Sequence, residues 1–208
     1  MILPSGAELR VTSPGGERTV VCVNGGQANE VAGTWSATLE YLVRELAPRF
    51  PDVSFAEVRY RVKSWKQLDM CIEDCREAIA ASSGPVRLLG FSMGGAVAIA
   101  SAADHRVEGV VGLAPWIPDR LGVGTLAGKR LDVLHGSLDR YLPGIPGVSP
   151  TSSRRGFDRA RALGVEGSYE LIPGALHGIA LRAHWGRPVP LPRAGRWAQR
   201  VAAQLETL

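Results

Sequence analysis

The stretch GFSMGG, residues 90–95, places a small polar residue, Ser92, between glycines where one structural element gives way to another. The apolar run VRLL (86–89) precedes it and the alanine-rich run AVAIASAAD (96–104) follows it. The first run is typical of a buried strand and the second of a helix. A G-x-S-x-G pattern in this strand–turn–helix setting predicts a sharp turn with a serine hydroxyl at its apex.

Such a turn suits a serine that reacts. The small residues two positions to either side relieve backbone crowding in a strained conformation. The helix that follows directs its first N–H groups to the same place, where they favour developing negative charge. The alternative is a glycine-flanked serine that only caps a helix, and the strand–turn–helix setting disfavours it. Ser92 is therefore the candidate nucleophile.

Strand and helix patterns alternate along the rest of the chain. Strands are expected at 8–14, 18–24, 55–62, 85–92, 107–115, 130–136 and 167–174. Helices are expected at 34–50, 64–83 (begun by Ser64 as N-cap), 94–104, 152–164 and 193–208. The first two strands, joined by the turn GGE, are expected to pair with each other in antiparallel fashion.

The later strands predict how the sheet is covered. Several of them are apolar throughout, as expected where helices cover both faces of a sheet. The alternation therefore predicts an α/β fold with a mostly parallel, doubly covered sheet. The 208 residues suit one domain, residues 1–208, because neither loop-rich segment (141–150 and 184–192) is long enough for an interdomain linker.

Composition and charge exclude several classes of function. The chain has 24 Lys and Arg against 20 Asp and Glu, a formal charge of +4, and the basic residues are spread out. A nucleic-acid-binding face normally shows a denser basic stripe, so no such partner is expected. No apolar stretch approaches the length of a membrane span, and the N-terminus lacks the pattern of a signal peptide. A cytoplasmic location is expected.

The three cysteines predict neither a disulfide framework nor a metal centre. Cys22 lies in an apolar strand pattern, where a buried and inert thiol is the usual outcome. Cys71 and Cys75 lie four apart on an expected helix, and the nearest histidine in sequence is His105. An odd count without scaffold spacing favours a reducing compartment. We expect no cofactor and no metal.

A nucleophilic serine needs a base, and the chain offers four histidines. His177 directly follows the last strand, at the carboxyl edge of the sheet where α/β proteins place their chemistry. His135 ends a strand, where a structural role is expected. His105 precedes a strand and so belongs at the opposite edge, and His184 lies seven residues beyond His177, where it could line the rim. His177 is the candidate base.

The base needs a carboxylate to hold its tautomer and to stabilise the imidazolium. Asp139, in HGSLDRYLP, follows the strand at 130–136 and is the first candidate. Asp119, in PWIPD, follows the preceding strand and is the second. The order Ser92, Asp139, His177 is the one expected for a triad on this kind of sheet.

Taken together, these motifs resemble the α/β-hydrolase superfamily over the whole chain. GFSMGGA resembles the nucleophile elbow of its esterase and thioesterase branches, LHGSLDRYLP its acid loop, and IPGALHG the segment that carries its base. The resemblance implies an oxyanion hole made by the N–H of Met93 and one from the loop NGGQ. There Gly26 is the matched position, with Gln27 left open. Asn24 departs from the family, where H-G-x is usual.

The segment after the strand at 107–115 is short, WIPDRLGVGTLAGK, so we expect no lid domain. Trp116 and Tyr141 follow strands at the site edge and are candidates for the substrate pocket. Arg61 and Lys63 leave a strand at the same edge and could meet an anionic substrate, although solvated charge is the expected outcome.

The resemblance implies a serine hydrolase of esters or thioesters that acts through an acyl-enzyme without a cofactor. The absence of a lid predicts short or medium acyl groups in small soluble substrates. A same-fold amidase or cofactor-free haloperoxidase-like activity is one alternative, and a catalytically silent binding protein is the other. The natural substrate and the oligomeric state stay open.

Overall fold

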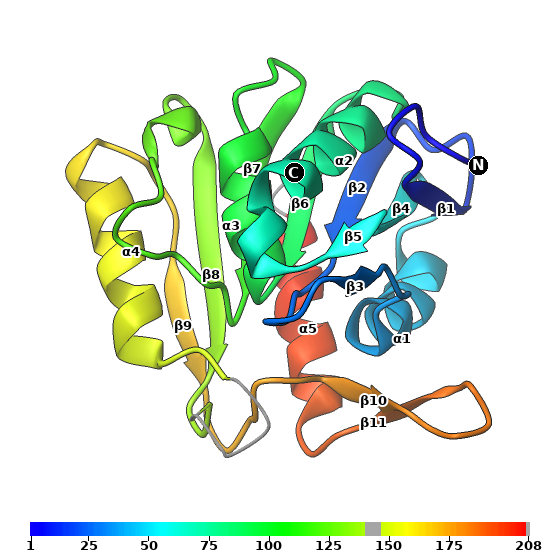
Figure 1. Ribbon diagram of the computed structural model, residues 1–208. Coiled ribbons are helices and arrows are strands. Elements are labelled where there is room, and N and C mark those ends of the chain that lie inside the picture. Colours follow the sequence, from blue (N-terminus) through cyan, green and yellow to red (C-terminus); the bar gives the residue numbers. More distant parts are fainter. Residues whose placement is uncertain (140–146, 207–208) are drawn as a thin grey trace.

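The computed structural model describes residues 1–139 and 147–206. Over these ranges it contains a seven-stranded sheet with helices on both faces (Figure 1). In sheet order the strands are β1 (Glu8–Thr12), β4 (Val53–Arg59), β2 (Arg18–Val23), β6 (Val86–Phe91), β7 (Val107–Leu113), β8 (Arg130–Gly136) and β9 (Tyr169–Ile172). Only β1 runs antiparallel to its neighbour. The expected mostly parallel α/β sheet is confirmed.

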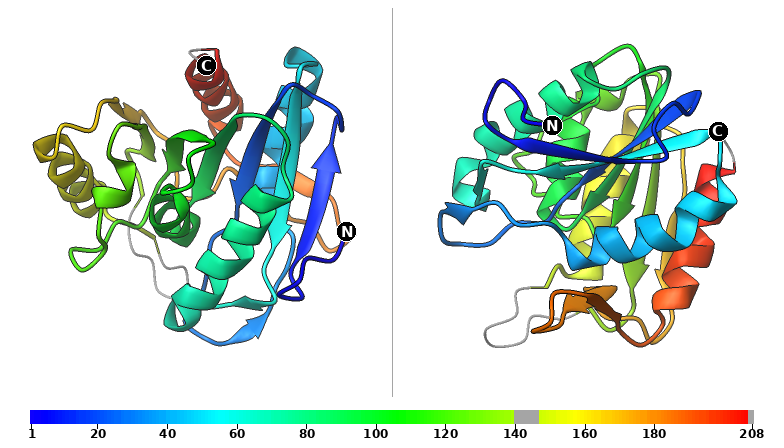
Figure 2. Two further views of the ribbon diagram at one scale, coloured as in Figure 1. Left: turned by 90° about the horizontal axis from the view of Figure 1, so that it is seen from above. Right: turned by 90° about the vertical axis from the view of Figure 1, so that its right-hand side faces the viewer.

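Different helices cover the two faces of the sheet, as the views in Figure 2 show. The helices are α1 (Ala37–Leu46), α2 (Leu68–Ala80), α3 (Met93–Ser101), α4 (Pro150–Ala162) and α5 (Ala194–Leu205), with 3₁₀ turns η1 (Ala47–Arg49), η2 (Trp65–Gln67) and η3 (Gly124–Leu126). Strand residues alternate between the faces: Val21 and Val23 pack in the core with α2, α3 and α4, whereas Val20 and Cys22 pack with α1 and α5. This alternation explains why the inner strands are apolar throughout.

The expected pairing of the first two strands is wrong. β1 pairs antiparallel with β4, and β4 lies between β1 and β2. The loop 13–17 crosses the start of β4, where the Ser54 hydroxyl donates to Ser13 O at 2.8 Å and accepts from the Gly16 N–H at 3.0 Å. A loop of this length spans one intervening strand, whereas a hairpin needs a tight turn.

The region after β4 also differs in detail from the expectation. Ser64 caps the short helix η2, accepting from the Lys66 N–H at 3.2 Å, and the long helix α2 begins only at Leu68. Two short antiparallel ladders were not expected. One joins β3 (Val31–Ala32) to β5 (Val62–Lys63), and the other joins β10 (Ala180–Arg182) to β11 (Pro188–Pro190).

The connections at the carboxyl ends of the strands decide where a site can form. Between β7 and β8 the described residues 114–129 contain only the single turn η3, so the expected absence of a lid domain is confirmed. The arrowheads of β8 and β9 point toward the lower part of Figure 1, where the β10–β11 hairpin also lies. Within the described part of the chain, no helix is long and apolar enough to cross a membrane.

Candidate active site

Ser92 stands at the turn between β6 and α3 in a conformation that few non-glycine residues adopt, with φ 54° and ψ −118°. Such backbone strain costs about 1–3 kcal/mol and persists only where the surroundings enforce it. Here the Ser92 N–H donates to Leu113 O at 2.9 Å. Ser92 O accepts from the N–H groups of Gly95 and Trp116, each at 2.9 Å. Hydrogen bonds to the neighbouring strand and to the first turn of α3 therefore hold the serine at the apex.

The glycines around Ser92 allow the backbone to pack this tightly. A Cβ on Gly94 would lie 2.1 Å from Val23 O, at the end of β2. A Cβ on Gly90 would lie 2.4 Å from Gly94 O. Both approaches are to backbone atoms, which cannot move aside as a flexible side chain can. The G-x-S-x-G spacing thus lets α3 begin against the ends of β2 and β6.

The structure brings Ser92, His177 and Asp139 together in one line of hydrogen bonds. Ser92 Oγ lies 3.0 Å from His177 Nε2, and His177 Nδ1 lies 2.6 Å from Asp139 Oδ2. An ionised carboxylate only accepts, so Nδ1 carries the proton and Nε2 is left to accept from the serine hydroxyl. The three residues lie after β6, β9 and β8 respectively.

Asp139 is fully buried and well supplied with donors. The Val148 N–H donates to Oδ1 at 3.1 Å, and both His177 and His135 lie within hydrogen-bond distance of Oδ2. Burial by itself raises the pKa of Asp139, but the hydrogen bonds from His135 and His177 outweigh it, and the pKa lies below its ordinary value. Asp139 is therefore held as a carboxylate at neutral pH.

His135 is the second histidine on this carboxylate. Its Nε2 lies 2.9 Å from Asp139 Oδ2 and 2.9 Å from Val148 O. Both partners are acceptors, so Nε2 carries the proton, and Nδ1 has no partner among the described residues. The ring is completely buried. The structural role expected for His135 thus includes a direct contact with the candidate acid. The spacing H-G-x-x-D, which sets His135 four residues before Asp139, was the available signal.

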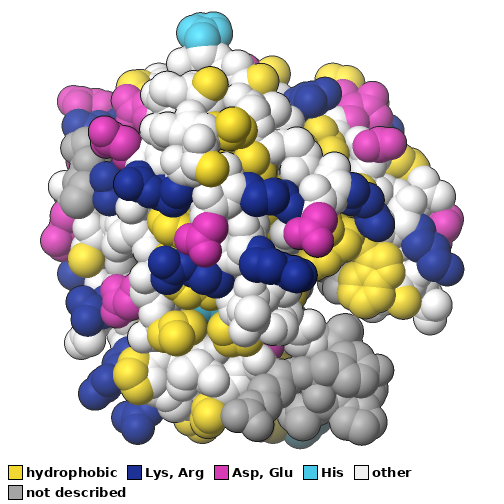
Figure 3. Space-filling view, turned by 90° about the vertical axis from the view of Figure 1, so that its left-hand side faces the viewer, with side chains coloured by type: hydrophobic (Ala, Val, Ile, Leu, Met, Phe, Trp, Pro, Cys, Tyr) yellow, Lys and Arg dark blue, Asp and Glu magenta, His cyan; other side chains and the backbone are white. Residues whose placement is uncertain are grey.

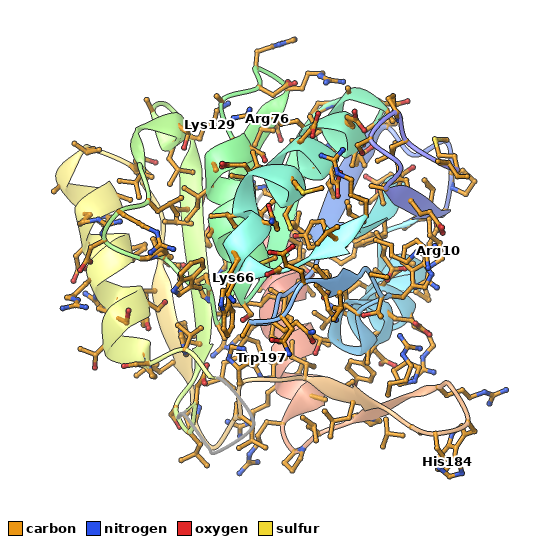
Figure 4. The ribbon with its side chains drawn as sticks, viewed as in Figure 1. Arg10, Lys66, Arg76, Lys129, His184 and Trp197 are labelled. Carbon is orange, nitrogen blue, oxygen red and sulfur yellow. The ribbon has the colours of Figure 1, made fainter. Side chains whose placement is uncertain are left out.

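The other acid and base candidates lie elsewhere. The Asp119 side chain is 72% exposed and pairs with Arg159 on α4 at 3.0 Å. His105 is 91% exposed and lies before β7, at the amino edge of the sheet as expected. His184 lies in the turn of the β10–β11 hairpin, edge-on to Trp185 at 4.4 Å between ring centroids (Figure 4).

The loop after β2 packs on the first residue of α3, where the sequence places the oxyanion hole. A Cβ on Gly26 would lie 2.2 Å from Met93 Sδ. The buried Asn24 fixes this loop: its Nδ2 donates to Thr34 O at 2.8 Å, and its Oδ1 accepts from the Gly25 N–H at 2.7 Å. The Gly25 N–H is thereby occupied, which leaves Gly26 and Gln27 as the candidate donors of the loop. Asn24 was noted in the sequence only as a departure; its two hydrogen bonds give it a positioning role.

A cavity of about 690 Å³ opens in front of Ser92 and His177. Trp116 lines it, as expected, and so do Met93, Gly26 and Gln27. Tyr141 lies outside the described residues. The sequence did not single out Trp65 or Arg120, which also line the cavity. Trp65 lies in the short 3₁₀ turn η2, where the first turn of a longer helix was expected, and Arg120 lies in the loop between β7 and η3.

Lys63 and Arg61, the two basic residues that leave a strand at the site edge, lie in different surroundings. Lys63 lines the cavity, whereas Arg61 does not. Arg61 instead pairs with Glu73 and with Asp74 on α2, the latter at 3.3 Å, and donates to Ser5 O at 3.2 Å. Arg61 is thus held by carboxylates of α2 away from the cavity, whereas solvated charge was the expected outcome.

The cysteines offer no competing nucleophile. Burial raises the pKa of Cys71 to about 11 and that of Cys75 to about 12, and it raises the pKa of Cys22 as well. Thiols with such pKa values are protonated at neutral pH and react slowly. Among the described residues, no three His, Cys, Asp or Glu side chains gather as a metal site.

Comparisons with known proteins agree on the fold. No family model and no curated protein sequence matches the chain. Among solved structures, an α/β serine hydrolase homologue from Coxiella burnetii aligns with a TM-score of 0.68 at 16% identity, covering 96% of this chain and 91% of its own.

Two further structures show the same likeness. An esterase from Exiguobacterium antarcticum aligns with a TM-score of 0.67 at 14% identity, over 99% of this chain and 98% of its own. A serine hydrolase without lid from Xanthomonas campestris aligns with a TM-score of 0.59 at 16% identity, over 85% of this chain and 83% of its own. At such identities the likeness establishes the fold, so the chain has the α/β-hydrolase fold.

Proposed function

We propose that the protein is a serine hydrolase that cleaves ester or thioester bonds through an acyl-enzyme on Ser92. The observation that carries the proposal is the line of hydrogen bonds from Ser92 Oγ to His177 Nε2 (3.0 Å) and from His177 Nδ1 to Asp139 Oδ2 (2.6 Å). Two distances within hydrogen-bond range, with the tautomer set by a buried carboxylate, are what a nucleophile, a base and its orienting acid require.

In the first half-reaction His177 Nε2 takes the proton of the Ser92 hydroxyl while Oγ attacks the substrate carbonyl. The carbonyl oxygen becomes an oxyanion, which we assign to the N–H of Met93 together with that of Gly26 or Gln27. His177 then gives its proton to the leaving alcohol or thiol as the tetrahedral intermediate collapses. The products of this half are the free leaving group and the ester of Ser92.

In the second half-reaction a water molecule replaces the leaving group. His177 Nε2 takes a proton from this water, which attacks the acyl carbonyl, and then returns the proton to Ser92 Oγ as the acid departs. Asp139 stays ionised throughout and stabilises the imidazolium that forms in each half. Its low pKa and its hydrogen bond to the Val148 N–H support this role.

The cavity supports small or medium acyl groups. It has a volume of about 690 Å³, and residues 114–129 add no lid that would enclose a long chain. Short or medium acyl groups in soluble substrates are therefore the proposed class.

The alternatives separate by experiment. A catalytically silent binding protein of the same fold would not react with a fluorophosphonate probe, whereas the proposed enzyme is labelled on Ser92 and Ser92→Ala is not. Unlabelled wild-type protein with an intact fold would overturn the proposal. A panel of matched esters, thioesters and anilides then distinguishes an esterase from an amidase, with faster turnover expected for the ester and thioester.

A further inference from the structure

The charge of the cavity in front of Ser92 is one-sided. Its lining includes two cations, Lys63 and Arg120, and no aspartate or glutamate among the described residues. Asp139 lies behind His177 and does not line it. A substrate in this cavity therefore meets positive charge without a compensating carboxylate on the wall.

Elsewhere on the molecule, many basic side chains pair with carboxylates. Figure 3 shows the face that carries α4, where dark blue basic side chains stand among magenta acidic ones. Arg154 pairs with Asp158 at 2.8 Å and Arg159 with Asp119 at 3.0 Å. Asp119, the neighbour of Arg120 in sequence, is thus paired with a residue of α4 and not with Arg120.

Arg120 itself has no carboxylate and no hydrogen-bond partner among the described residues. Its guanidinium instead lies over the Trp116 ring, 5.5 Å from the centroid. Cation–π stacking holds the guanidinium plane against an aromatic surface and leaves its N–H groups free to donate. Arg120 is therefore placed to bind an anion that sits beside Trp116.

Lys63 is partly buried at the end of β5, and it lines the cavity together with Trp65, two residues further along the chain. Its Nζ donates to Thr34 Oγ1 at 2.8 Å, and no carboxylate pairs with it among the described residues. Burial lowers its pKa, with no neighbouring carboxylate to offset the loss of solvation. An ammonium group has three donors, so two remain for a ligand.

From this arrangement we propose that the site is specific for substrates that carry an anionic group, a carboxylate or a phosphate, bound by Lys63 and Arg120. The proposal rests on the proposed hydrolase function and names its substrate class. The two tryptophans of the cavity, Trp65 and Trp116, supply apolar walls for the organic part of the substrate next to the charge.

The kinetic test uses pairs of substrates of similar shape, one anionic and one neutral, with each rate divided by that of uncatalysed hydrolysis. On the acyl side, 4-nitrophenyl hydrogen adipate is compared with 4-nitrophenyl 6-oxoheptanoate. On the leaving-group side, 4-acetoxybenzoate is compared with 4-acetoxyacetophenone. In one of these two pairs the wild type prefers the anion, and the responding pair shows which half of the substrate carries it. Lys63→Gln and Arg120→Gln each lower the anion-to-neutral ratio of kcat/KM about tenfold.

Matched variants control for charge and for shape. Lys66 is exposed, lies three residues from Lys63 and does not line the cavity, so Lys66→Gln leaves the ratio within twofold (Figure 4). Arg120→Lys retains the positive charge and restores part of the preference. Raised ionic strength lowers the anionic rate only. A ratio unaffected by Lys63→Gln and Arg120→Gln in both pairs overturns the proposal.

A binding measurement separates this proposal from the proposed function. Calorimetry of the Ser92→Ala variant with both pairs of substrates needs no turnover. Tighter binding of the anion that Lys63→Gln weakens supports the charge preference even if no ester is hydrolysed. Hydrolysis of the esters with equal binding of anion and neutral partner in both pairs leaves the hydrolase intact and removes the charge preference.

Discussion

The loops after β7 and after β8 each carry an aspartate that could serve a catalytic histidine, and they treat it in opposite ways. Asp119, after β7, is 72% exposed and pairs with Arg159 on α4. Asp139, after β8, is only 1% exposed to solvent. Its carboxylate accepts from the Val148 N–H, and two histidines lie within hydrogen-bond distance of Oδ2. A place after a strand makes a carboxylate a candidate, and its burial and donors decide what it can do.

The loop after β7 has a different task. It contains Trp116 and Arg120, which line the cavity, and it brings Asp119 to α4 instead of to the site. One loop therefore shapes the pocket wall, whereas the other holds the proposed acid. Substitutions in the loop after β7 should accordingly alter substrate specificity, and substitutions in the loop after β8 should alter turnover.

The largest expected effect comes from exchanging the two carboxylates for amides. Asp139→Asn removes the charge that stabilises the His177 imidazolium and the acceptor that fixes its tautomer, so kcat falls about 10⁴-fold. Asp119→Asn loses only an exposed ion pair and changes kcat less than twofold. Steady-state hydrolysis of a 4-nitrophenyl ester measures both. The reverse order of effects would reassign the acid to Asp119.

A smaller effect is expected at His135, which we propose as a positioning residue that acts through Asp139. His135→Phe removes one donor to Asp139 and leaves Val148 O without its partner, so kcat falls about tenfold, as expected for one hydrogen bond to a charged group. KM is unchanged, since His135 does not line the cavity. His135→Gln, which retains a donor, restores part of kcat.

The exposed His105 provides the control for that experiment, and His105→Gln leaves both constants unchanged. If His135→Phe lowered the thermal stability but not kcat, the ring would serve packing alone.

A still smaller effect is expected for the dependence of kcat/KM on acyl-chain length, which the open cavity beside the loop after β7 limits. Each methylene buried in the cavity contributes about 0.8 kcal/mol, about fourfold in kcat/KM. For 4-nitrophenyl esters from acetate to palmitate, kcat/KM rises over the first few carbons and then levels off, because residues 114–129 provide no lid to cover more. No rate jump occurs when substrate passes its solubility limit. A steady rise to palmitate, or activation at the interface, would contradict an open cavity.

The smallest effect is on acid stability. The pKa of Asp139 is lower in the folded protein than in the unfolded chain, so its stabilisation is complete above the unfolded value and is lost as pH falls through the folded one. Urea unfolding of wild type and Asp139→Asn between pH 7 and pH 3 measures this contribution. The difference in unfolding free energy shrinks on the acid side. A constant difference would mean that the carboxylate gains nothing from its donors.

The pattern of the sequence predicted the sheet and the positions of the candidate residues because both depend on local features. Ser92, Asp139 and His177 each lie in the segment that follows a strand, and parallel strands end at one edge. The structure brings these three residues together, while their chemical roles remain proposals. The partner of β1 could not be predicted in this way, since it depends on β4, some forty residues later.

The pocket wall was largely beyond sequence reasoning for a related physical reason. Trp65 was expected in the first turn of a helix at 64–83 but lies in the short 3₁₀ turn η2, and Arg120 lies in a loop, so helical periodicity did not show which way either side chain points. The β10–β11 hairpin was expected as a loop because its sequence is rich in proline. Charge alone also could not separate Lys63, which lines the cavity, from Arg61, which carboxylates of α2 hold away from it.

The central claim, an acyl-enzyme on Ser92, is tested most directly by mass spectrometry of the protein quenched in acid during turnover of a 4-nitrophenyl ester. We expect an initial burst of 4-nitrophenol and a mass increase equal to one acyl group. Peptide mapping then places the acyl group on Ser92, and Ser92→Ala shows neither the burst nor the adduct. Hydrolysis by Ser92→Ala at the wild-type rate, or an adduct on another residue, would contradict the account.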